Sequence, residues 1–375
     1  MPIAHSIPPG IGNPPSKRSS SRARKIDATP TLFPDVPPLR DSGPETLLPP
    51  GSAPERVGIA RLALSSPLAD TKRGTEYFVL PVKSILNHCD STRVPFSWTV
   101  NPYRGCEFGC QYCYARYTHE FMELDGQDFE KKIYVKKDSG PLAARDLGKE
   151  RVQGKHIAIG TATDPYQPAE REFGATRAIL EEMATRRGLS VSITTKSDQV
   201  LRDVDLLRRI GEHSNISVNL SITTLRTRLA RLLEPRAPRP DLRMRAVQEL
   251  RRAGIVAGVF AMPVLPGITD REEDLDAVAR AARDAGAQWF AANVLFLMPS
   301  AQKQFLPFLD AKFPKLAKRY REWFSRDAYA PEAYRREIYE RVRALRRKYG
   351  LGVRPLDPGR PAEAQRQMSL GLEVA

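Results

Sequence analysis

The most regular pattern in the chain is an alternation of apolar runs with amphipathic segments between residues 156 and 297. The apolar runs are continuous and rich in β-branched residues, as is typical of strands buried on both faces of a parallel sheet. Strands are predicted at 156–163, 190–195, 215–223, 255–264 and 288–297, and helices at 171–186, 200–210, 241–253 and 271–284. In 241–253, for example, apolar residues at 242, 246, 247 and 250 fall on one helical face.

A further strand is predicted at 96–100, ahead of this repeat, which brings the number of strands to six. Repeated strand–helix units with short connections imply parallel strands joined by right-handed crossovers. Six strands are too few to close an eight-stranded barrel. The predicted fold class is therefore α/β, a partial (β/α)6 barrel of TIM type, in which chemistry is expected at the C-terminal ends of the strands.

The segments that flank the repeat differ from it in composition. Pro, Ser, Gly and basic residues dominate the first 55 residues, which cannot bury enough apolar surface to fold. Strand-like 76–80 and the charged helical segment 302–349 suggest ordered extensions on either side of the barrel. The predicted parts are a disordered basic tail (1–55), an N-terminal extension packing on the barrel (56–95), the barrel (96–300), C-terminal helices (301–352) and a flexible tail (353–375).

The charge balance points to a polyanionic partner. The 375 residues include 59 Lys and Arg against 44 Asp and Glu, a formal net charge of +15. Such an excess favours nucleic acid as the partner, with DNA ahead of RNA, although a solvated surface with a basic tail would give the same balance.

No apolar run reaches the roughly 18 residues that would indicate a membrane span, so no membrane partner is expected. The first residues lack the pattern of a secretory signal, which favours the cytoplasm. Three of the four cysteines lie within eight residues. In a reducing compartment this clustering indicates metal ligation or redox chemistry rather than a disulfide framework.

Residues 101–116, NPYRGCEFGCQYCYAR, contain Cys106, Cys110 and Cys113 in a C-x3-C-x2-C spacing. Three thiolates can hold an iron–sulfur cluster or zinc, but structural zinc sites and electron-transfer clusters use four ligands. A fourth ligand could come from His119, or from His88 and Cys89 upstream. Alternatively, a cluster with three protein ligands leaves one iron open to bind a small molecule.

This spacing, with Tyr112 directly ahead of the third cysteine, resembles the radical S-adenosylmethionine (SAM) superfamily. The resemblance implies that the three cysteines hold a 4Fe-4S cluster and that its open iron is chelated by the amino and carboxylate groups of SAM. An electron from the cluster, supplied by a donor such as flavodoxin or ferredoxin, cleaves SAM to methionine and a 5′-deoxyadenosyl radical. That radical abstracts a hydrogen atom from the substrate. The partial (β/α)6 barrel of the superfamily agrees with the strand count.

Segments between about residues 95 and 297 resemble the spore photoproduct lyase branch and its uncharacterised bacterial relatives. The matching segments are GTATDPYQ at 160–167, TTKS at 194–197, LSIT at 220–223, EPRAP at 234–238 and MPV at 262–264. Each lies at or near the C-terminal end of a predicted strand, which is the side that the cluster occupies in this fold.

The resemblance also implies which residues contact SAM. They are Lys196 for the carboxylate, Ser221 on the fourth strand, Thr163 and Asp164 near the amino group, Tyr112 and Tyr114 beside the cluster, and Met262 at the adenine. Simpler interpretations exist for several of them. Lys196 could be a solvated loop lysine, Asp164 the start of a turn before Pro165, and Tyr112 a packing residue. Arg236 could pair with Glu234 as ordinary surface charge.

One feature of the branch is missing. Spore photoproduct lyase returns a hydrogen atom from a cysteine after its second strand, and residues 161–163 contain no cysteine. Cys89 is the only other thiol, and we expect it to be a buried structural cysteine. Tyr114, Tyr166 or no protein donor remain as alternatives.

The predicted function is a radical SAM enzyme that abstracts hydrogen, with a repair-like, lyase-related reaction on DNA. The alternatives are a radical SAM enzyme that modifies RNA or protein, and a non-catalytic zinc-bound nucleic-acid-binding protein. Methylthio transfer would need a second cysteine cluster, which the sequence does not contain.

The C-terminal peptide QMSLGL at 367–372 resembles the short motif with which bacterial repair and replication proteins bind the sliding DNA clamp. In such a motif a glutamine, here Gln367, bonds at the mouth of a groove that spaced apolar residues fill. Met368, Leu370 and Leu372 would be these anchors. A tail that packs on its own domain is the alternative interpretation.

We expect deletion of residues 367–372 to eliminate binding to a bacterial sliding clamp without altering SAM cleavage, because the motif lies beyond the predicted barrel. Clamp binding can be measured by surface plasmon resonance, and SAM cleavage by the yield of 5′-deoxyadenosine. Undiminished clamp binding by the shortened chain would refute the assignment of this peptide.

Overall fold

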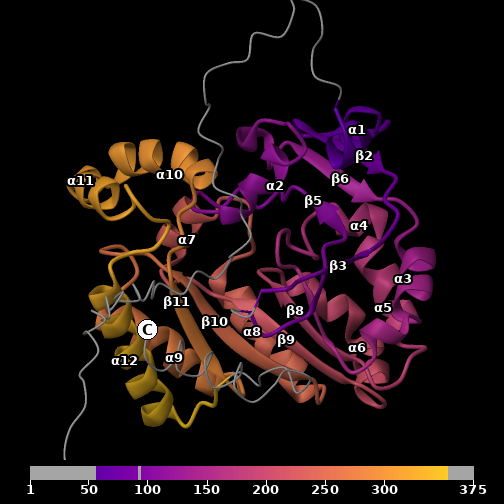
Figure 1. Ribbon diagram of the computed structural model, residues 1–375. Coiled ribbons are helices and arrows are strands. Elements are labelled where there is room, and N and C mark those ends of the chain that lie inside the picture. Colours follow the sequence, from indigo (N-terminus) through magenta and orange to yellow (C-terminus); the bar gives the residue numbers. More distant parts are fainter. Residues whose placement is uncertain (1–55, 92–93, 354–375) are drawn as a thin grey trace, which may run out of the picture. The chain divides into compact units, whose positions relative to one another are not determined.

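The computed structural model describes residues 56–91 and 94–353 of the chain (Figure 1). The predicted basic tail at 1–55 and the clamp-like peptide at 367–372 lie outside the described residues, so both remain predictions.

The main sheet contains six parallel strands in the order β11-β10-β9-β8-β7-β4 (Figure 1). They are β4 (Trp98–Val100), β7 (His156–Ile159), β8 (Ser190–Thr195), β9 (Asn215–Ser221), β10 (Val256–Val264) and β11 (Phe290–Val294). A seventh strand, β3 (Leu86–His88), pairs antiparallel with β4 and forms the other edge. The two edge strands do not pair with each other. The predicted six-stranded partial barrel is therefore confirmed.

Helices follow the strands as the sequence predicts. They are α4 (Glu170–Phe173), α5 (Ala175–Met183), α6 (Val204–Gly211), α7 (Thr227–Leu233), α8 (Pro240–Arg252) and α9 (Glu272–Asp284), with a 3-10 turn η4 (Asp198–Asp203) before α6. Their apolar faces pack on the strands in one core that includes Ile157, Val191, Val218, Val247 and Val278. The helix predicted at 171–186 is divided at Gly174, where φ is +58°.

The strand predicted at 156–163 ends four residues early, and Gly160 gives the reason. Its φ is +88°, a conformation that side chains disfavour. A Cβ atom there would lie 2.4 Å from the Thr194 carbonyl oxygen. The chain therefore turns sharply out of β7, and residues 161–167 form a loop against the end of β8.

A second sheet, which the sequence analysis did not predict, joins the N-terminal extension to the cysteine region. Its order is β1-β2-β6-β5, with β1 (Leu68–Lys72), β2 (Thr75–Leu80), β5 (Tyr103–Arg104) and β6 (Lys132–Lys136). One face packs Tyr103 and Ile133 against Ala169 and Ala175 of the barrel. The other packs Leu80 and Tyr134 against Ala63 of α1 (Gly58–Leu64) and against Met122.

The cysteine segment directly follows β5 of this second sheet. Short helical turns connect it to the rest of the chain: η1 (Tyr114–Arg116), α2 (Tyr117–Glu120), η2 (Gly126–Asp128), α3 (Ser139–Leu147) and η3 (Glu150–Val152). The segment thus belongs to the connection between β5 and β6 of the second sheet.

The C-terminal helices are α10 (Pro299–Lys312), α11 (Pro314–Trp323) and α12 (Glu332–Tyr349). Phe305, Tyr320 and Phe324 are buried in the same apolar cluster as Cys106 and Cys110, so α10 and α11 cover the cysteine segment. Helix α12 packs against α9, where Lys348 pairs with Asp276 at 2.6 Å. Among the described residues, none of the helices has the length and apolar character needed to cross a bilayer.

Candidate active site

The cysteine loop, residues 105–113, begins at a glycine that no other residue could replace without a shift of the backbone. Gly105 has a φ of +85°. A Cβ atom at this position would lie 2.6 Å from the Lys132 carbonyl oxygen and 2.8 Å from that of Phe129. The next residue confirms this close approach, because the Cys106 N–H donates to the Phe129 carbonyl oxygen at 3.0 Å. The loop is therefore seated directly on the backbone that leads into β6.

Three buried side chains hold the loop to the end of β7, and we call Glu107, Thr163 and Gln167 the loop clamp. The Gln167 amide donates to the Gly105 carbonyl oxygen at 3.1 Å and accepts from the Glu107 N–H at 2.9 Å. The Thr163 hydroxyl donates to the same Gly105 oxygen at 2.6 Å. The sequence predicted Thr163 as a SAM contact, and the structure shows that its hydroxyl serves the loop.

The Glu107 carboxylate extends the loop clamp to β2 of the second sheet and to the start of α4. It accepts from the Ala169 N–H at 2.7 Å and from the Tyr77 hydroxyl on β2 at 2.9 Å. Burial raises the pKa of Glu107, although these two hydrogen bonds oppose the shift. Sequence reasoning missed Glu107 and Gln167 as functional residues. Gln167 could have been recognised, because it is the last residue of the segment GTATDPYQ, which resembles the spore photoproduct lyase branch.

Cys106 and Cys110 are buried and Cys113 is half-buried, in an apolar cluster with Phe108, Tyr112 and Phe129. Burial raises the pKa of all three thiols, that of Cys110 to about 12. The positive charges of Lys196 and Arg116 oppose this shift at Cys113. Such thiols become thiolates when a metal centre supplies the compensating charge, so the chemistry of this set fits a bound cluster.

No three His, Cys, Asp or Glu side chains within the described ranges are grouped closely enough to hold a single metal ion. His119, one of the fourth ligands considered above, has its Nε2 atom 3.0 Å from the Lys132 carbonyl oxygen. The rings of Phe129 and Tyr134 flank its imidazole, and burial lowers its pKa to about 4. The second group considered is His88 and Cys89, and the exposed His88 pairs with Asp90 at 2.7 Å. Cys89 is half-buried, not buried as expected.

Asp164 ties the loop after β7 to the loop after β8. Its carboxylate accepts from the Tyr166 N–H at 2.9 Å, the Thr195 hydroxyl at 2.6 Å and the Lys196 N–H at 2.7 Å. The bond to Tyr166 makes Asp164 the turn residue that the simpler interpretation proposed. Three accepted bonds leave a lone pair on the carboxylate for a further donor.

Lys196 lies over the Tyr112 ring, with Nζ 5.8 Å from the ring centroid. Burial opposes its charge, but Cys110, Glu234 and Asp164 together raise its pKa. Within the described residues the ammonium has no hydrogen bond or ion pair. This half-buried cation beside Cys110 differs from the solvated loop lysine of the simpler interpretation.

A buried network behind Cys110 centres on Glu234, and we call it the Glu234 network. Glu234 is 2% exposed, and its carboxylate pairs with Arg243 at 2.6 Å and accepts from the Tyr112 hydroxyl. Thr223 Oγ1 lies 3.0 Å from both the Glu234 carboxylate and the Met262 carbonyl oxygen. Arg243 also donates to the Ser221 carbonyl oxygen at 3.0 Å.

The network corrects one expectation. Glu234 pairs with Arg243 of α8 and not with Arg236, whose side chain is exposed. Burial would raise the pKa of Glu234, but the charges of Arg243 and Lys196 hold it below its ordinary value. Arg243 was missed, although an arginine on the otherwise apolar face of the predicted helix 241–253 was a usable signal.

The remaining predicted site residues adjoin the same loop and network. Tyr114 donates its hydroxyl to the Thr161 carbonyl oxygen, and its ring stacks on Tyr117 at 6.3 Å. Ser221 is buried at the end of β9, and among the described residues its hydroxyl has no hydrogen bond. Met262 is half-buried. Tyr166, considered as a hydrogen donor, is 1% exposed in the sheet core.

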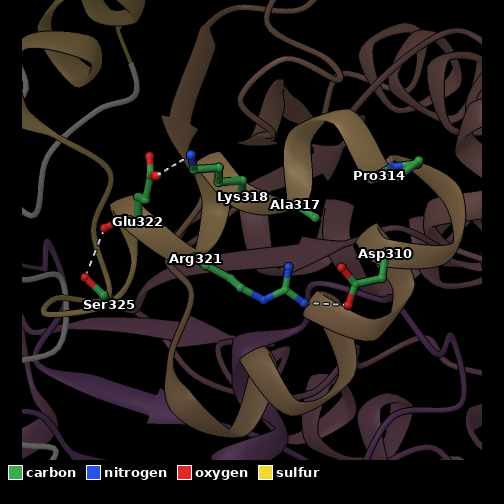
Figure 2. Close-up of a pocket in the computed structure, with 7 residues that line it drawn as sticks. All are labelled: Asp310, Pro314, Ala317, Lys318, Arg321, Glu322 and Ser325. Carbon is green, nitrogen blue, oxygen red and sulfur yellow. Dashed lines mark hydrogen bonds and ion pairs between the residues drawn. The ribbon is translucent and has the colours of Figure 1, made fainter.

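A surface hollow of about 640 Å³ lies on α10 and α11 (Figure 2). Its lining residues are Asp310, Pro314, Ala317, Lys318, Arg321, Glu322 and Ser325. Arg321 pairs with Asp310, and Lys318 pairs with Glu322. Its charged groups are thus already paired, and none of its residues belongs to the predicted site.

The chain is similar in sequence to known proteins. The sequence model of the Radical SAM superfamily matches residues 100–279. The uncharacterised protein Rv2578c of Mycobacterium tuberculosis is 34% identical over 308 residues, which cover 81% of this chain and 89% of that protein. The uncharacterised protein MJ0683 of Methanocaldococcus jannaschii is 30% identical over 225 residues, or 60% of this chain and 80% of that protein.

Among solved structures, spore photoproduct lyase complexed with dinucleoside spore photoproduct has a similar fold. The TM-score is 0.54 at 13% sequence identity, and the match covers 73% of this chain and 79% of that one. A mutant of the same enzyme with bound AdoMet and the dinucleoside gives a TM-score of 0.55 over the same shares. At this identity the likeness concerns the fold.

We expect Glu234→Gln to lower the free energy of unfolding by about 3–5 kcal/mol, because it leaves the Arg243 guanidinium buried without its counter-charge. The double substitution Glu234→Gln with Arg243→Met should lose less than Glu234→Gln alone, since it removes both charges. Urea unfolding followed by circular dichroism measures both. The exposed Arg236→Gln is the control, with a change below about 0.5 kcal/mol. Additive losses in the double variant would contradict a coupled buried pair.

Proposed function

The chain belongs to the radical SAM superfamily, and from this premise we propose that Cys106, Cys110 and Cys113 hold a 4Fe-4S cluster beside a SAM molecule. The observation that carries the proposal is the connection of the three-thiol loop to three strand ends of the barrel. The loop clamp joins it to β7, Asp164 links the β7 and β8 loops, and the Glu234 network reaches β9. A cofactor pair at this edge would therefore meet side chains that one set of buried hydrogen bonds holds in place.

The side chains around the loop fit SAM as well as a cluster. Lys196 offers an ammonium group without a partner among the described residues, which suits a carboxylate. Asp164 retains a lone pair for an ammonium group, and the Ser221 hydroxyl is available at the end of β9. Half-buried Met262 offers apolar surface for adenine. The Lys196 ammonium group lies over the ring of Tyr112, whose hydroxyl donates to the Glu234 carboxylate.

The bound cluster, once reduced, would supply one electron that cleaves SAM to methionine and a 5′-deoxyadenosyl radical. That radical would take a hydrogen atom from the substrate. The protein's part is to place and enclose the reacting groups. Phe108, Tyr112 and Phe129 surround the thiols with apolar surface that excludes water. The positive charges of Lys196 and Arg116 lower the pKa of the Cys113 thiol and so oppose the larger, raising effect of burial. The clamp fixes the loop to the barrel, so the thiols keep their positions relative to Lys196.

The substrate that we propose is nucleic acid, with DNA ahead of RNA, in a repair-like reaction. The net charge of +15 supports a polyanionic substrate. Spore photoproduct lyase shares the fold, and its structure contains a dinucleoside photoproduct. We further propose that a flavodoxin or ferredoxin supplies the electron in a reducing cytoplasm. The peptide at 367–372 would recruit the enzyme to a sliding clamp.

The central test is anaerobic reconstitution with iron and sulfide, followed by addition of dithionite and SAM. We expect about four irons per chain, because a 4Fe-4S cluster is held by thiolates in this way, and formation of 5′-deoxyadenosine. Cys110→Ala should lose cluster and SAM cleavage together, and Cys89→Ala should lose neither. Bound zinc without SAM cleavage, or cleavage that survives in Cys110→Ala, would contradict the proposal.

The role of Lys196 requires its own variant. We expect Lys196→Met to retain the iron content of the wild type but to bind SAM at least about tenfold more weakly, because a charge-assisted contact to the carboxylate contributes about 1.5–3 kcal/mol. Equilibrium dialysis with labelled SAM measures the affinity. The exposed Lys155→Met serves as a control for the loss of one positive charge. Unchanged SAM affinity in Lys196→Met would remove this residue from the site.

A further inference from the structure

Two positively charged residues meet on the second sheet, next to the cysteine loop, and the proposed function does not use them. Arg104 ends β5 and Lys136 ends β6. Arg104 is opposite Tyr134 in the antiparallel register. Because side chains alternate along a strand, Lys136 lies on the same face as Tyr134 and Arg104. The two cations are therefore diagonal neighbours on one face.

Lys136 is buried and Arg104 is half-buried, and neither has an anionic partner among the described residues. Lys136 is 4% exposed. Among the described residues its ammonium group has neither a hydrogen bond nor an ion pair, and the same holds for the guanidinium of the half-buried Arg104, whose Nε is fully buried. Burial, and the charge of Arg104, lower the pKa of Lys136 to about 7. The protein thus keeps two neighbouring positive groups away from water at a cost in free energy.

In the part of the chain that the structure describes, no acid beside the pair offsets this cost. Across β2, Leu80 is opposite Lys136, and Phe78 is opposite Tyr134. Glu76 lies at the far end of the face, opposite Lys132, which already pairs with Asp128 at 2.8 Å. Other buried arginines of the described chain have carboxylate partners, as Arg243 has Glu234 and Arg116 has Glu130, each within 2.7 Å. The unpaired state of Arg104 and Lys136 is therefore an exception.

Arg104 also lies near Tyr117, which in turn lies near the cysteine loop. Burial raises the pKa of Tyr117, the charge of Arg104 opposes that shift, and Cys89 and Cys113 add to it. Tyr117 stacks on Tyr114 at 6.3 Å and meets Phe121 edge-on at 5.4 Å. Phe121 is 49% exposed. A row of aromatic rings, Phe121, Tyr117 and Tyr114, thus leads from the surface to the cysteine loop, with Arg104 near Tyr117.

We propose that Arg104 and Lys136 bind one backbone phosphate of the nucleic-acid substrate and so position it beside the cluster loop. The inference rests on the proposed function and names the site at which that substrate is held. A planar guanidinium and a lysine ammonium are the usual side chains for phosphate, and such contacts set the register of a nucleic acid on a protein. The adjacent aromatic rings favour nucleic acid over a carboxylate-bearing peptide, because unstacked bases bind on such rings.

The test compares Lys136→Gln and Arg104→Gln with Lys137→Gln in the reconstituted full-length protein. Lys137 is the matched control, because it is the next residue, carries the same charge and is exposed. Binding of a fluorescein-labelled single-stranded oligonucleotide is followed by anisotropy over a series of salt concentrations. We expect each of the first two variants to bind about fivefold to tenfold more weakly, with a salt slope smaller by about 0.7, as for the loss of one phosphate contact. Lys137→Gln should stay within about twofold of the wild type.

A second measurement separates a phosphate site from a structural role. Inorganic phosphate should raise the melting temperature of the wild type and of Lys137→Gln but not of Lys136→Gln. In phosphate-free buffer, Lys136→Gln should melt above the wild type, because it removes an uncompensated buried charge. If an acidic residue of the chain outside the described ranges occupies the pair, Lys136→Gln would instead melt lower and phosphate would not protect the wild type. That outcome overturns the proposal.

The remaining outcomes distinguish this inference from the function on which it rests. If the wild type binds the oligonucleotide and Lys136→Gln and Arg104→Gln bind it equally well, the phosphate site is wrong and the nucleic-acid substrate stands. If the wild type forms 5′-deoxyadenosine but binds no oligonucleotide, the substrate class is wrong and the inference falls with it. Phosphate that protects Lys136→Gln as well as the wild type also overturns the site.

Discussion

The cysteine loop depends on one physical constraint, which is that every polar group buried around it needs a partner. Gly105 brings the loop so close to the backbone before β6 that water is excluded, and its carbonyl oxygen is left to Thr163 and Gln167. Glu107 then needs donors of its own and finds them on β2 and at the start of α4. Satisfying these groups joins the two sheets at the loop.

The same constraint acts behind Cys110. A carboxylate as deeply buried as that of Glu234 requires a full counter-charge, and Arg243 supplies it from α8. The pair then fixes Tyr112, and Tyr112 supports Lys196. Few of these residues carry chemistry themselves. Their effect is to hold the thiols, the lysine and the strand ends in one arrangement, which a reaction with a radical intermediate needs.

The barrel could be predicted from the sequence because its strands are apolar or β-branched runs that alternate regularly with amphipathic helices, as 255–264 does with 241–253 and 271–284. The second sheet could not be predicted, since β5 has only two residues and β6 is a five-residue strand with a lysine at each end. Its central pairing also joins β2 to β6 from distant parts of the chain. The three cysteines were identified from their spacing. The partner of Glu234 was not identified from the sequence, because Arg236 and Arg243 both lie near it in the chain. Only the burial of Arg243 distinguishes the two.

The placement of the loop clamp has a consequence for the biosynthesis of the protein. The cysteines precede Gln167 and Glu234 in the chain, yet they depend on both for their positions. A ribosome adds residues in order at a limited rate, and a domain folds when its long-range contacts become available. The three thiols are therefore made well before they are fixed, and they stay exposed to oxidants during translation. Under the proposed function, a cluster in its final arrangement would be a product of the completed barrel, and its assembly would follow the synthesis of α8.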